Sequence, residues 1–247
     1  ITGTIAFDGS IAFGEFLETR ISATKTFTVN EAKTFKNHFL HNFGTYIMQQ
    51  DAIIENTGDW TNENIMSFDV PVGGHVYGTV KFMGEGIVQN VTSNDYEFKK
   101  VVFDNKNGII PGFIHLDNGD AYNVTIATDA LFTYGYVDAE THNKMLVFKD
   151  NATVAGASDN SFVDGNVRKI GNDAFMFPTG DITAGPVYDY LAIGISSPAV
   201  TTDHFTARFN HIILIRSIAE AYSKLHLSTM FHKSNIGYST EPTELLM

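Results

Sequence analysis

Three carboxylates lie four residues apart in the first third of the chain: Asp51, Glu55 and Asp59. Two convergent carboxyl groups can act as acid and base on a glycosidic bond, so this spacing on adjacent corners of a turning chain is a candidate for sugar chemistry. However, 28 of the 247 residues are acidic, and acids are expected to fall near one another without any catalytic role. We therefore predict a protein that is not an enzyme, with polysaccharide cleavage as the alternative.

Two aromatic residues, Tyr46 and Trp60, are candidate ligand-binding residues. They end two similar segments, NFGTY at Asn42–Tyr46 and NTGDW at Asn56–Trp60, and Trp60 is the only tryptophan. Exposed, the two rings could stack on a glycan, because aromatic rings combine an apolar face with a polar handle. Buried, they would be stacked core residues of successive coils. The residues favour the buried interpretation and leave both open.

Calcium is the one cofactor that the residue types suggest. Asp117, Asn118 and Asp120 offer the oxygen ligands that this ion prefers. A tight solvated turn needs the same residue types, and we favour the turn. The chain has no cysteine, and no pair of histidines has metal-ligand spacing with a third ligand nearby, so no other metal or cofactor is predicted.

Charge and motifs exclude several functions. The net charge is −12, and phosphate recognition needs clustered lysine and arginine, so we predict no nucleic-acid partner. No stretch of 18 apolar residues is present, and we predict no membrane insertion. The glycine-rich phosphate loop, the serine nucleophile elbow and the H-E-x-x-H zinc motif are all absent from the sequence.

The elements that would position these residues are short strands. Apolar and polar residues alternate in segments such as Thr26–Val29, Tyr122–Ile126 and Leu146–Phe148, and clusters of Asn, Asp and Gly separate them. This pattern predicts an all-β fold. Short strands with Asn/Gly corners favour a β-solenoid of parallel β-helix type over residues 1–157, in which each coil buries its apolar face on the next. An antiparallel sandwich with repetitive turns is the alternative.

Two further segments follow. Small residues cluster at 151–160, which places a boundary after residue 157 and predicts a smaller β-sandwich-like module at 158–210. In the tail at 211–247, apolar residues from Ile212 to Leu225 form a helical stripe with Arg216, Glu220 and Lys224 between them. We expect a C-terminal helix there, with a role that the sequence does not define.

The segment at 161–207 carries a resemblance to known proteins. It reads SFVDGNVRKIGNDAFMFPTGD at 161–181, continues as YLAIGIS at 190–196 and ends as DHFTA at 203–207. These phrases resemble a module of β-repeat cell-surface proteins of Bacteroidota that are exported by type IX secretion. That group includes gliding-motility-associated and adhesin-like proteins. Residues 210–247 do not continue the pattern of those proteins.

This resemblance implies an extracellular location at the cell surface and supplies no catalytic residues. We expect a non-catalytic structural or adhesive segment, such as a filament or surface-layer component. Its partners would be neighbouring surface proteins, further copies of itself, or polysaccharide. The alternative is a carbohydrate-binding or polysaccharide-cleaving β-helix.

Overall fold

The structure is a computed structural model that describes residues 5–7, 18–108, 110–116, 122–182, 188–210 and 232–233. All the regular elements in these residues are strands, so the predicted all-β fold is confirmed. None of the described residues belongs to a helix that could cross a membrane. The predicted tail helix lies outside the described residues, apart from His232, which belongs to the two-residue strand β27 (His232–Lys233).

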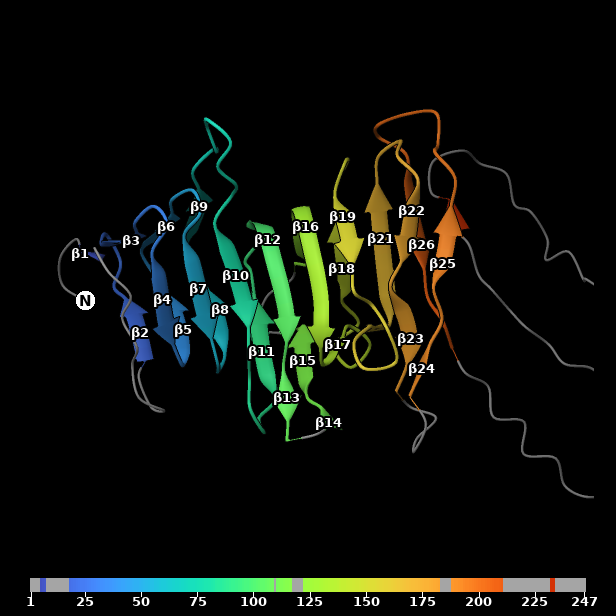
Figure 1. The fold of residues 1–247 in the computed structure, drawn as a ribbon, viewed down its shortest axis with the longest axis horizontal. Helices are drawn as coiled ribbons and strands as arrows, with labels where there is room; N and C mark the ends of the chain where they lie inside the picture. Colours follow the sequence, from blue (N-terminus) through green and yellow to red (C-terminus); the bar gives the residue numbers. More distant parts are fainter. Residues whose placement is uncertain are drawn as a thin grey trace, which may run out of the picture.

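Most strands belong to three sheets: two long ones run side by side along the molecule, and a four-stranded one lies beside the first coils at the N-terminal end (Figure 1). Sheet A contains β1 (Ile5–Phe7), β3 (Thr26–Val29), β6 (Thr45–Met48) and β9 (Ile65–Phe68). Sheet B contains β4 (Thr34–Asn37), β7 (Ile53–Asn56), β10 (Thr79–Phe82), β12 (Glu97–Asp104), β16 (Val124–Tyr134), β18 (Met145–Phe148), β21 (Asn166–Ile170), β26 (His204–Ala207) and β27, and β19 (Thr153–Ala155) also pairs with β16. Sheet C contains β2 (Glu18–Ile21), β5 (Phe39–Asn42), β8 (Trp60–Asn62), β11 (Gln89–Thr92), β15 (Phe113–Leu116), β17 (Tyr136–Asp138), β20 (Val163–Asp164), β23 (Thr179–Asp181) and β24 (Asp189–Tyr190). Two small pairs complete the set: β13 (Lys106–Asn107) with β14 (Ile110–Pro111), and β22 (Phe175–Phe177) with β25 (Ile193–Ile195).

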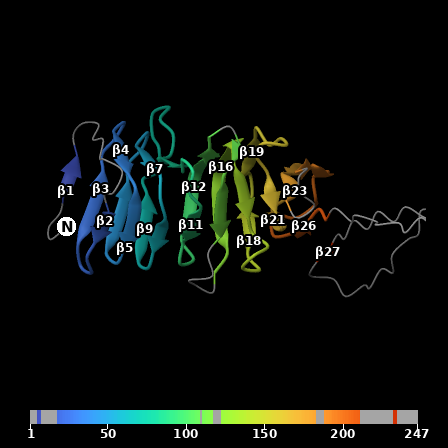
Figure 2. The same ribbon diagram turned by 90° about the horizontal axis from the view of Figure 1, so that it is seen from below.

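The chain winds through these sheets as a solenoid. It passes from β3 to β4 to β5, one strand in each sheet, and then repeats the circuit with β6, β7 and β8. Neighbouring coils pair in parallel: Phe27 is in register with Tyr46, and Tyr46 with Met66. In these first coils one circuit therefore takes about twenty residues, and the coils stack along the long axis of the molecule (Figure 2). This arrangement agrees with the predicted β-solenoid.

A continuous column of aromatic side chains fills the interior. Tyr46 lies 5.5 Å from Trp60, Trp60 lies 6.1 Å from Phe82, and Phe82 lies 6.0 Å from Phe103, measured between ring centroids. The buried apolar residues around this column form one cluster that extends from Ile21 to Ala207. Such distances suit edge-to-face and offset packing, which adds to the stabilisation that burial itself provides.

Buried amides close the corners between sheets. The side chain of Asn37 donates to that of Asn56 one coil further on, and at another corner Asn42 donates to Asn62 at 2.7 Å. Buried amides must find such partners, because an unpaired polar group in the core costs free energy. Gly58 stands at the first corner because a β-carbon there would lie 2.6 Å from the carbonyl oxygen of His38 in the preceding coil.

Sheets B and C continue without a break across residue 157, where the sequence places a domain boundary. Residues 158–210 supply β20, β21 and β23, which pair in parallel with the strands before them. The strand pairing changes from parallel to antiparallel only after β23, where the chain reverses its direction. β24, β25 and β26 then pair antiparallel with β23, β22 and β21. These three strands, which we call the cap, lie at the C-terminal end of the stack (Figure 1).

Candidate functional site

Tyr46 and Trp60 are both completely buried, with 0 % of either residue exposed. Their rings come from different sheets, since Tyr46 belongs to β6 of sheet A and Trp60 to β8 of sheet C. Burial raises the pKa of the Tyr46 hydroxyl well above its usual range. The ligand-binding interpretation of these residues is therefore wrong, because neither ring can reach a sugar. The two similar segments, Asn42–Tyr46 and Asn56–Trp60, therefore form two different corners of the coil.

The three candidate carboxylates do not converge. Asp51 and Asp59 lie in the turns on either side of β7, and Glu55 lies within that strand. The four residues of β7 span about 10 Å, at about 3.3 Å per residue, and this strand separates the turn of Asp51 from the turn of Asp59. Carboxyl pairs of glycosidases are about 5–9.5 Å apart. These three residues therefore do not form the acid–base pair that the alternative function requires.

Each of the three instead has a local structural partner. Glu55 pairs with Lys36 at 2.9 Å and Lys81 at 3.2 Å, its in-register neighbours on sheet B. Burial opposes the charge of Glu55, but these lysines outweigh it and lower the pKa of the carboxyl group. Asp59 accepts from the backbone N–H of Asn90 at 2.8 Å.

Asp51 holds the loop at residues 69–78. It accepts a hydrogen bond from the backbone N–H of Val76 at 2.8 Å and contacts the ring of His75. The Val76 hydrogen bond, followed by that from His75, lowers the pKa of Asp51, and Asp51 in turn raises the pKa of His75. Since both side chains serve this connection, the arrangement is structural.

The calcium candidates Asp117, Asn118 and Asp120 lie outside the described residues. Within the described ranges, no group of three or more His, Asp or Glu side chains is arranged to hold a metal ion.

An unexpected polar site lies on the outer face of sheet C toward the C-terminal end. Ile114, Val137 and Val163 point into the core in register. Because side chains alternate along a strand, the residues that follow them, His115, Asp138 and Asp164, point outward as a row. Yet Asp138 and Asp164 are buried, as is Asp181 at the end of β23. We call Asp138, Glu140, Asp164 and Asp181 the carboxylate cluster.

Asp138 is held by several donors. Its carboxylate accepts from the backbone N–H groups of Glu140 at 3.0 Å and Thr141 at 2.9 Å, and from the hydroxyl of Thr141. The Nε2 atom of His115 lies 3.4 Å from its other oxygen. The Asp138 carboxyl group is therefore held by hydrogen bonds within its own turn, and it lies beside the ring of His115.

Asp164 has a different environment. The residue is 2 % exposed, and among the described residues its Oδ1 atom has no hydrogen-bond partner. Burial, followed by the charges of Glu140, Asp181 and Asp138, raises the pKa of Asp164 to about 7. Perturbed carboxyl groups of this kind mark candidate functional sites.

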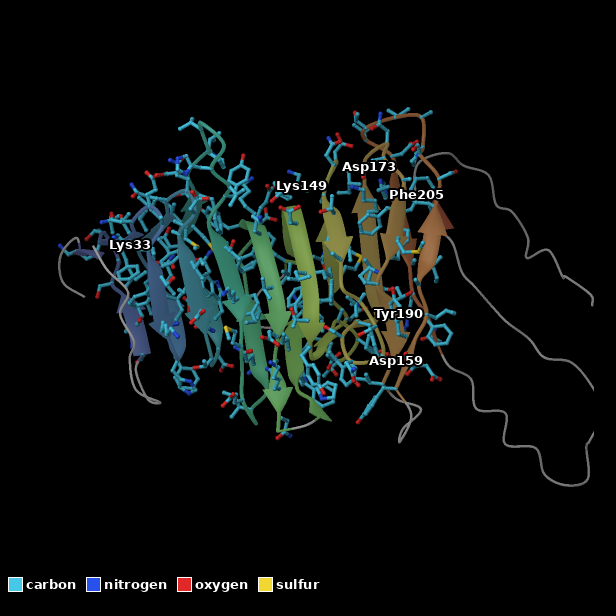
Figure 3. The ribbon with its side chains drawn as sticks, in the orientation of Figure 1. Lys33, Lys149, Asp159, Asp173, Tyr190 and Phe205 are labelled. Atoms are coloured by element: carbon cyan, nitrogen blue, oxygen red, sulfur yellow. The ribbon has the colours of Figure 1, made fainter. Side chains whose placement is uncertain are left out.

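Aromatic residues form a second row beside the carboxylate cluster. The rings of Phe113 and Tyr136 lie 5.8 Å apart, Tyr136 and Phe162 lie 4.6 Å apart, and Tyr136 and Tyr188 lie 4.8 Å apart. The hydroxyl of Tyr136 donates to the backbone carbonyl of Asp159, whose own side chain accepts from the N–H of Tyr190 (Figure 3). Only Tyr188 of this row is exposed, at 37 %.

Gly180 allows these two rows to pack closely. A β-carbon on Gly180 would lie 2.4 Å from the ring of Phe162, so only glycine leaves room for that ring over β23. The sequence does contain a signal for the whole site, namely the recurring triplet of an aromatic, an aliphatic and a polar residue. It appears at 113–115, 136–138 and 162–164, and these triplets align in register.

Comparisons with known proteins give the chain no relative: no family model, no curated protein and no solved structure matches it. The site must therefore be interpreted from its own geometry.

Proposed function

We propose that this chain is a rigid structural segment of an extracellular, cell-surface protein. The observation that carries the proposal is the uninterrupted column of buried side chains that connects all three sheets from Ile21 to Ala207. A solenoid with such a core transmits its shape from one coil to the next. Its function would be to hold an attached or neighbouring partner at a defined distance.

The dimensions suit this role. The nine described strands of sheet C, at about 4.8 Å per step, span roughly 38 Å. On the outer faces of the first coils, charges are neutralised between coils, as in the row of Lys36, Glu55 and Lys81. The net charge of −12 opposes nonspecific association.

The proposed location and partners rest on the resemblance of residues 161–207 to bacterial surface proteins. We propose exposure at the cell surface, with neighbouring surface proteins or further copies of the chain as partners. A filament or a surface layer would be a natural assembly for stacked coils. The role is adhesive or architectural and involves no chemical step.

Spin labels can measure the rigidity directly, because the natural chain has no cysteine. Ala23 and Ala174 are exposed near opposite ends of the stack, and Ala174 lies before β22, outside the cap, so Ala23→Cys with Ala174→Cys places one label at each end. We expect a single narrow distance distribution by pulsed electron paramagnetic resonance. A broad or bimodal distribution in the folded protein would contradict a rigid segment.

A replacement experiment in the producing cell tests the function itself. The segment would be exchanged for an unrelated β-solenoid of matched length, and surface exposure and adhesion would be measured. If shape is the function, the replacement restores adhesion, whereas a flexible linker of equal residue number does not. Failure of the solenoid replacement, with normal surface exposure, would indicate a specific binding site instead.

One observation favours glycan binding as a second candidate function. Tyr188 presents an exposed ring at the end of the aromatic row on sheet C, next to buried carboxylates. Titration calorimetry with a panel of polysaccharides would test it, with Tyr188→Ala compared with Tyr122→Ala, an exposed tyrosine outside the row. Binding that only Tyr188→Ala removes would support this candidate, and absence of binding by the natural chain would exclude it for that panel.

A further inference from the structure

The hydrophobic core ends in partly exposed apolar side chains at the C-terminal end of the stack. The rings of Phe148 and Phe175 lie 5.1 Å apart, and those of Phe175 and Phe177 also lie 5.1 Å apart. Beyond these rings β25 pairs with β22, so that Ile195 is opposite Phe175 and Ile193 is opposite Phe177. Because directly opposite residues share one face of a sheet, both isoleucines lie on the core side, and both are only partly buried.

Two more apolar side chains belong to this surface. The backbone N–H of Leu191 donates to the carbonyl of Thr179 at 2.9 Å, which places Leu191 opposite a buried residue, yet Leu191 is 43 % exposed. Phe205 of β26 is in register with the buried Lys169 and packs, partly buried, against the core at the same end of the molecule (Figure 3). We call these four residues the core end: Leu191, Ile193, Ile195 and Phe205.

The core end is the last layer of the stack (Figure 1). Among the described residues, no strand lies beyond β24 in sheet C or beyond β25 in its small pair. Each coil of a solenoid buries its apolar face on the next coil, and the terminal unit normally presents a polar outer face. The core end is apolar instead, so it has the character of a contact surface.

The chain itself returns to this surface. It leaves β26 after Ala207 and comes back as β27, which pairs antiparallel with β26 and places Lys233 in register with Phe205 of the core end. The connecting segment at 211–231, which lies outside the described residues, is therefore tethered at both ends beside the core end. Such a tether gives the segment a high effective concentration at that surface.

The sequence of this segment suits the core end in length. A helix over Ile212–Leu225, where the apolar stripe lies, would be about 21 Å long at 1.5 Å per residue. The last strand of the stack, from Asp189 to Ile195, extends about 20 Å at 3.3 Å per residue. Residues 226–231 can reach about 20 Å when extended, which is enough to return from the far end of the helix to β27.

Charge favours this segment over a second copy of the same surface. Residues 171–210 contain four aspartates and one arginine. Residues 211–233 contain three cations, Arg216, Lys224 and Lys233, and one carboxylate, Glu220. The segment and the end of the stack thus have opposite net charges, whereas two copies of the end would bring like charges together.

We propose that the core end is the docking site of the chain's own segment at 211–231, which lies across β24 and β25 with its apolar stripe on the core end. The docked segment covers the open end of the core and terminates the stack of coils. A further copy then cannot extend the stack at this end, so an assembly of such chains would form through other surfaces.

Engineered cysteines test the contact in the full chain, because the natural chain has none. Leu191→Cys is combined in turn with one cysteine on the apolar stripe, at Ile215, Ala219 or Tyr222. The matched controls lie on the opposite face of the expected helix, at Ser217, Glu220 or Lys224. Since a disulfide needs close approach of its two residues, we expect rapid crosslinking within one chain at a stripe position and none at the controls.

Hydrogen exchange measured by mass spectrometry tests the same contact without a crosslink. Leu191→Glu puts a charge into the core end at an exposed position, where it should leave the coils folded. Met176→Glu is the control, because Met176 is exposed on the opposite face of the same strand pair. We expect Leu191→Glu to lower the protection of peptides covering 212–225 about tenfold or more, and Met176→Glu to leave it unchanged. Peptides of β5 to β8 should be unaffected in both variants.

Three results would overturn the docking site. A stripe disulfide that forms between two chains would show that a second copy occupies the core end. Equal crosslinking at stripe and control positions would show that the segment has no defined contact face. Absence of protection at 212–225 in the natural chain, or protection that Leu191→Glu does not change, would show that the segment does not dock there.

Discussion

Charged side chains are arranged differently on the outer faces of the first coils and of the last coils of this solenoid. In the first coils, residues that stack in register alternate in charge, so that Glu55 lies between Lys36 and Lys81, with 17 % of its side chain exposed. In the last coils, His115, Asp138 and Asp164 stack in register, and the two acids are covered. A parallel stack places equivalent side chains about 4.8 Å apart, so like charges in one row must be neutralised or protonated.

The first coils and the last coil also differ in their interior. Tyr46, Trp60 and Phe82 fill the first coils with rings, and the corners are closed by neutral amides. The last coil instead buries a cation, Lys169, whose Nζ lies 2.6 Å from the carbonyl oxygen of Lys149 and 3.0 Å from Asp173. A uniform ladder can be extended by further coils, whereas a buried charge with specific partners marks one particular coil.

The largest effect is expected from the aromatic column. Phe82→Ala removes a ring that contacts both Trp60 and Phe103, and should lower the free energy of unfolding by about 3–5 kcal/mol. Urea unfolding followed by Trp60 fluorescence measures the loss. Phe39→Ala, at a partly exposed ring on the outer face, is the matched control and should cost far less. Equal losses in the two variants would show that the column is not the dominant core.

The second largest loss of stability is expected from replacing the buried lysine, Lys169. Lys169→Met removes the charge from a side chain that is 0 % exposed, together with its hydrogen bonds to two backbone carbonyls and its ion pair with Asp173. The Lys149 carbonyl keeps the N–H of Ala152 as a donor, and Asp173 keeps that of Asn151. Because Asp173 is 29 % exposed and partly solvated, we expect a loss of about 2–3 kcal/mol in urea unfolding.

Lys149→Met is the control for that variant. Lys149 directly follows β18, the strand that pairs with the strand of Lys169, and its side chain pairs with Glu97 at the surface (Figure 3). A surface pair contributes about 0–1 kcal/mol, so this variant should change stability little. A larger loss in Lys149→Met than in Lys169→Met would contradict the assigned roles.

The third largest loss of stability is expected from replacing a buried amide at one of the corners between the sheets. Asn56→Ala removes the acceptor of the buried Asn37 amide, which is then left unpaired, and one of the two donors to the carbonyl of Gly58, which keeps Gln89. We expect a loss of about 1–3 kcal/mol in thermal or urea unfolding. Asn90→Ala, at a half-buried amide that contacts Asp59, should cost less. No difference between the two would mean that the corner ladder adds nothing to stability.

The smallest effect is expected from the charged rows of the first coils. Glu55→Gln should lower the free energy of unfolding by about 0.2–1 kcal/mol, because its lysine partners remain solvated. The difference from the natural chain should shrink in 1 M salt, since added ions screen exposed charges. A difference that persists in high salt would indicate a packing effect.

The strand pattern could be predicted from the residues because alternation within segments such as Thr26–Val29 reflects which side faces the core. The number of residues in a coil could not be predicted in the same way, because the corners differ in length. NFGTY and NTGDW resemble each other as corners, yet they lead into different sheets.

The carboxylate cluster was partly visible in the triplets at 113–115, 136–138 and 162–164. Their outward direction follows from alternation alone. The raised pKa of Asp164 depends on charges from other segments of the chain, Glu140, Asp181 and Asp138, which no local pattern predicts. The same limit explains Lys169, whose partners are carbonyls of the preceding coil.

Trp60 offers the most direct test of the continuous core on which the structural role depends. It is the only tryptophan, so the emission maximum and iodide quenching of the natural chain report on one site. A ring buried in the column predicts blue-shifted emission, little quenching and no response to a panel of polysaccharides. Red-shifted, quenchable emission that changes with one glycan would contradict the buried column and favour a carbohydrate-binding surface.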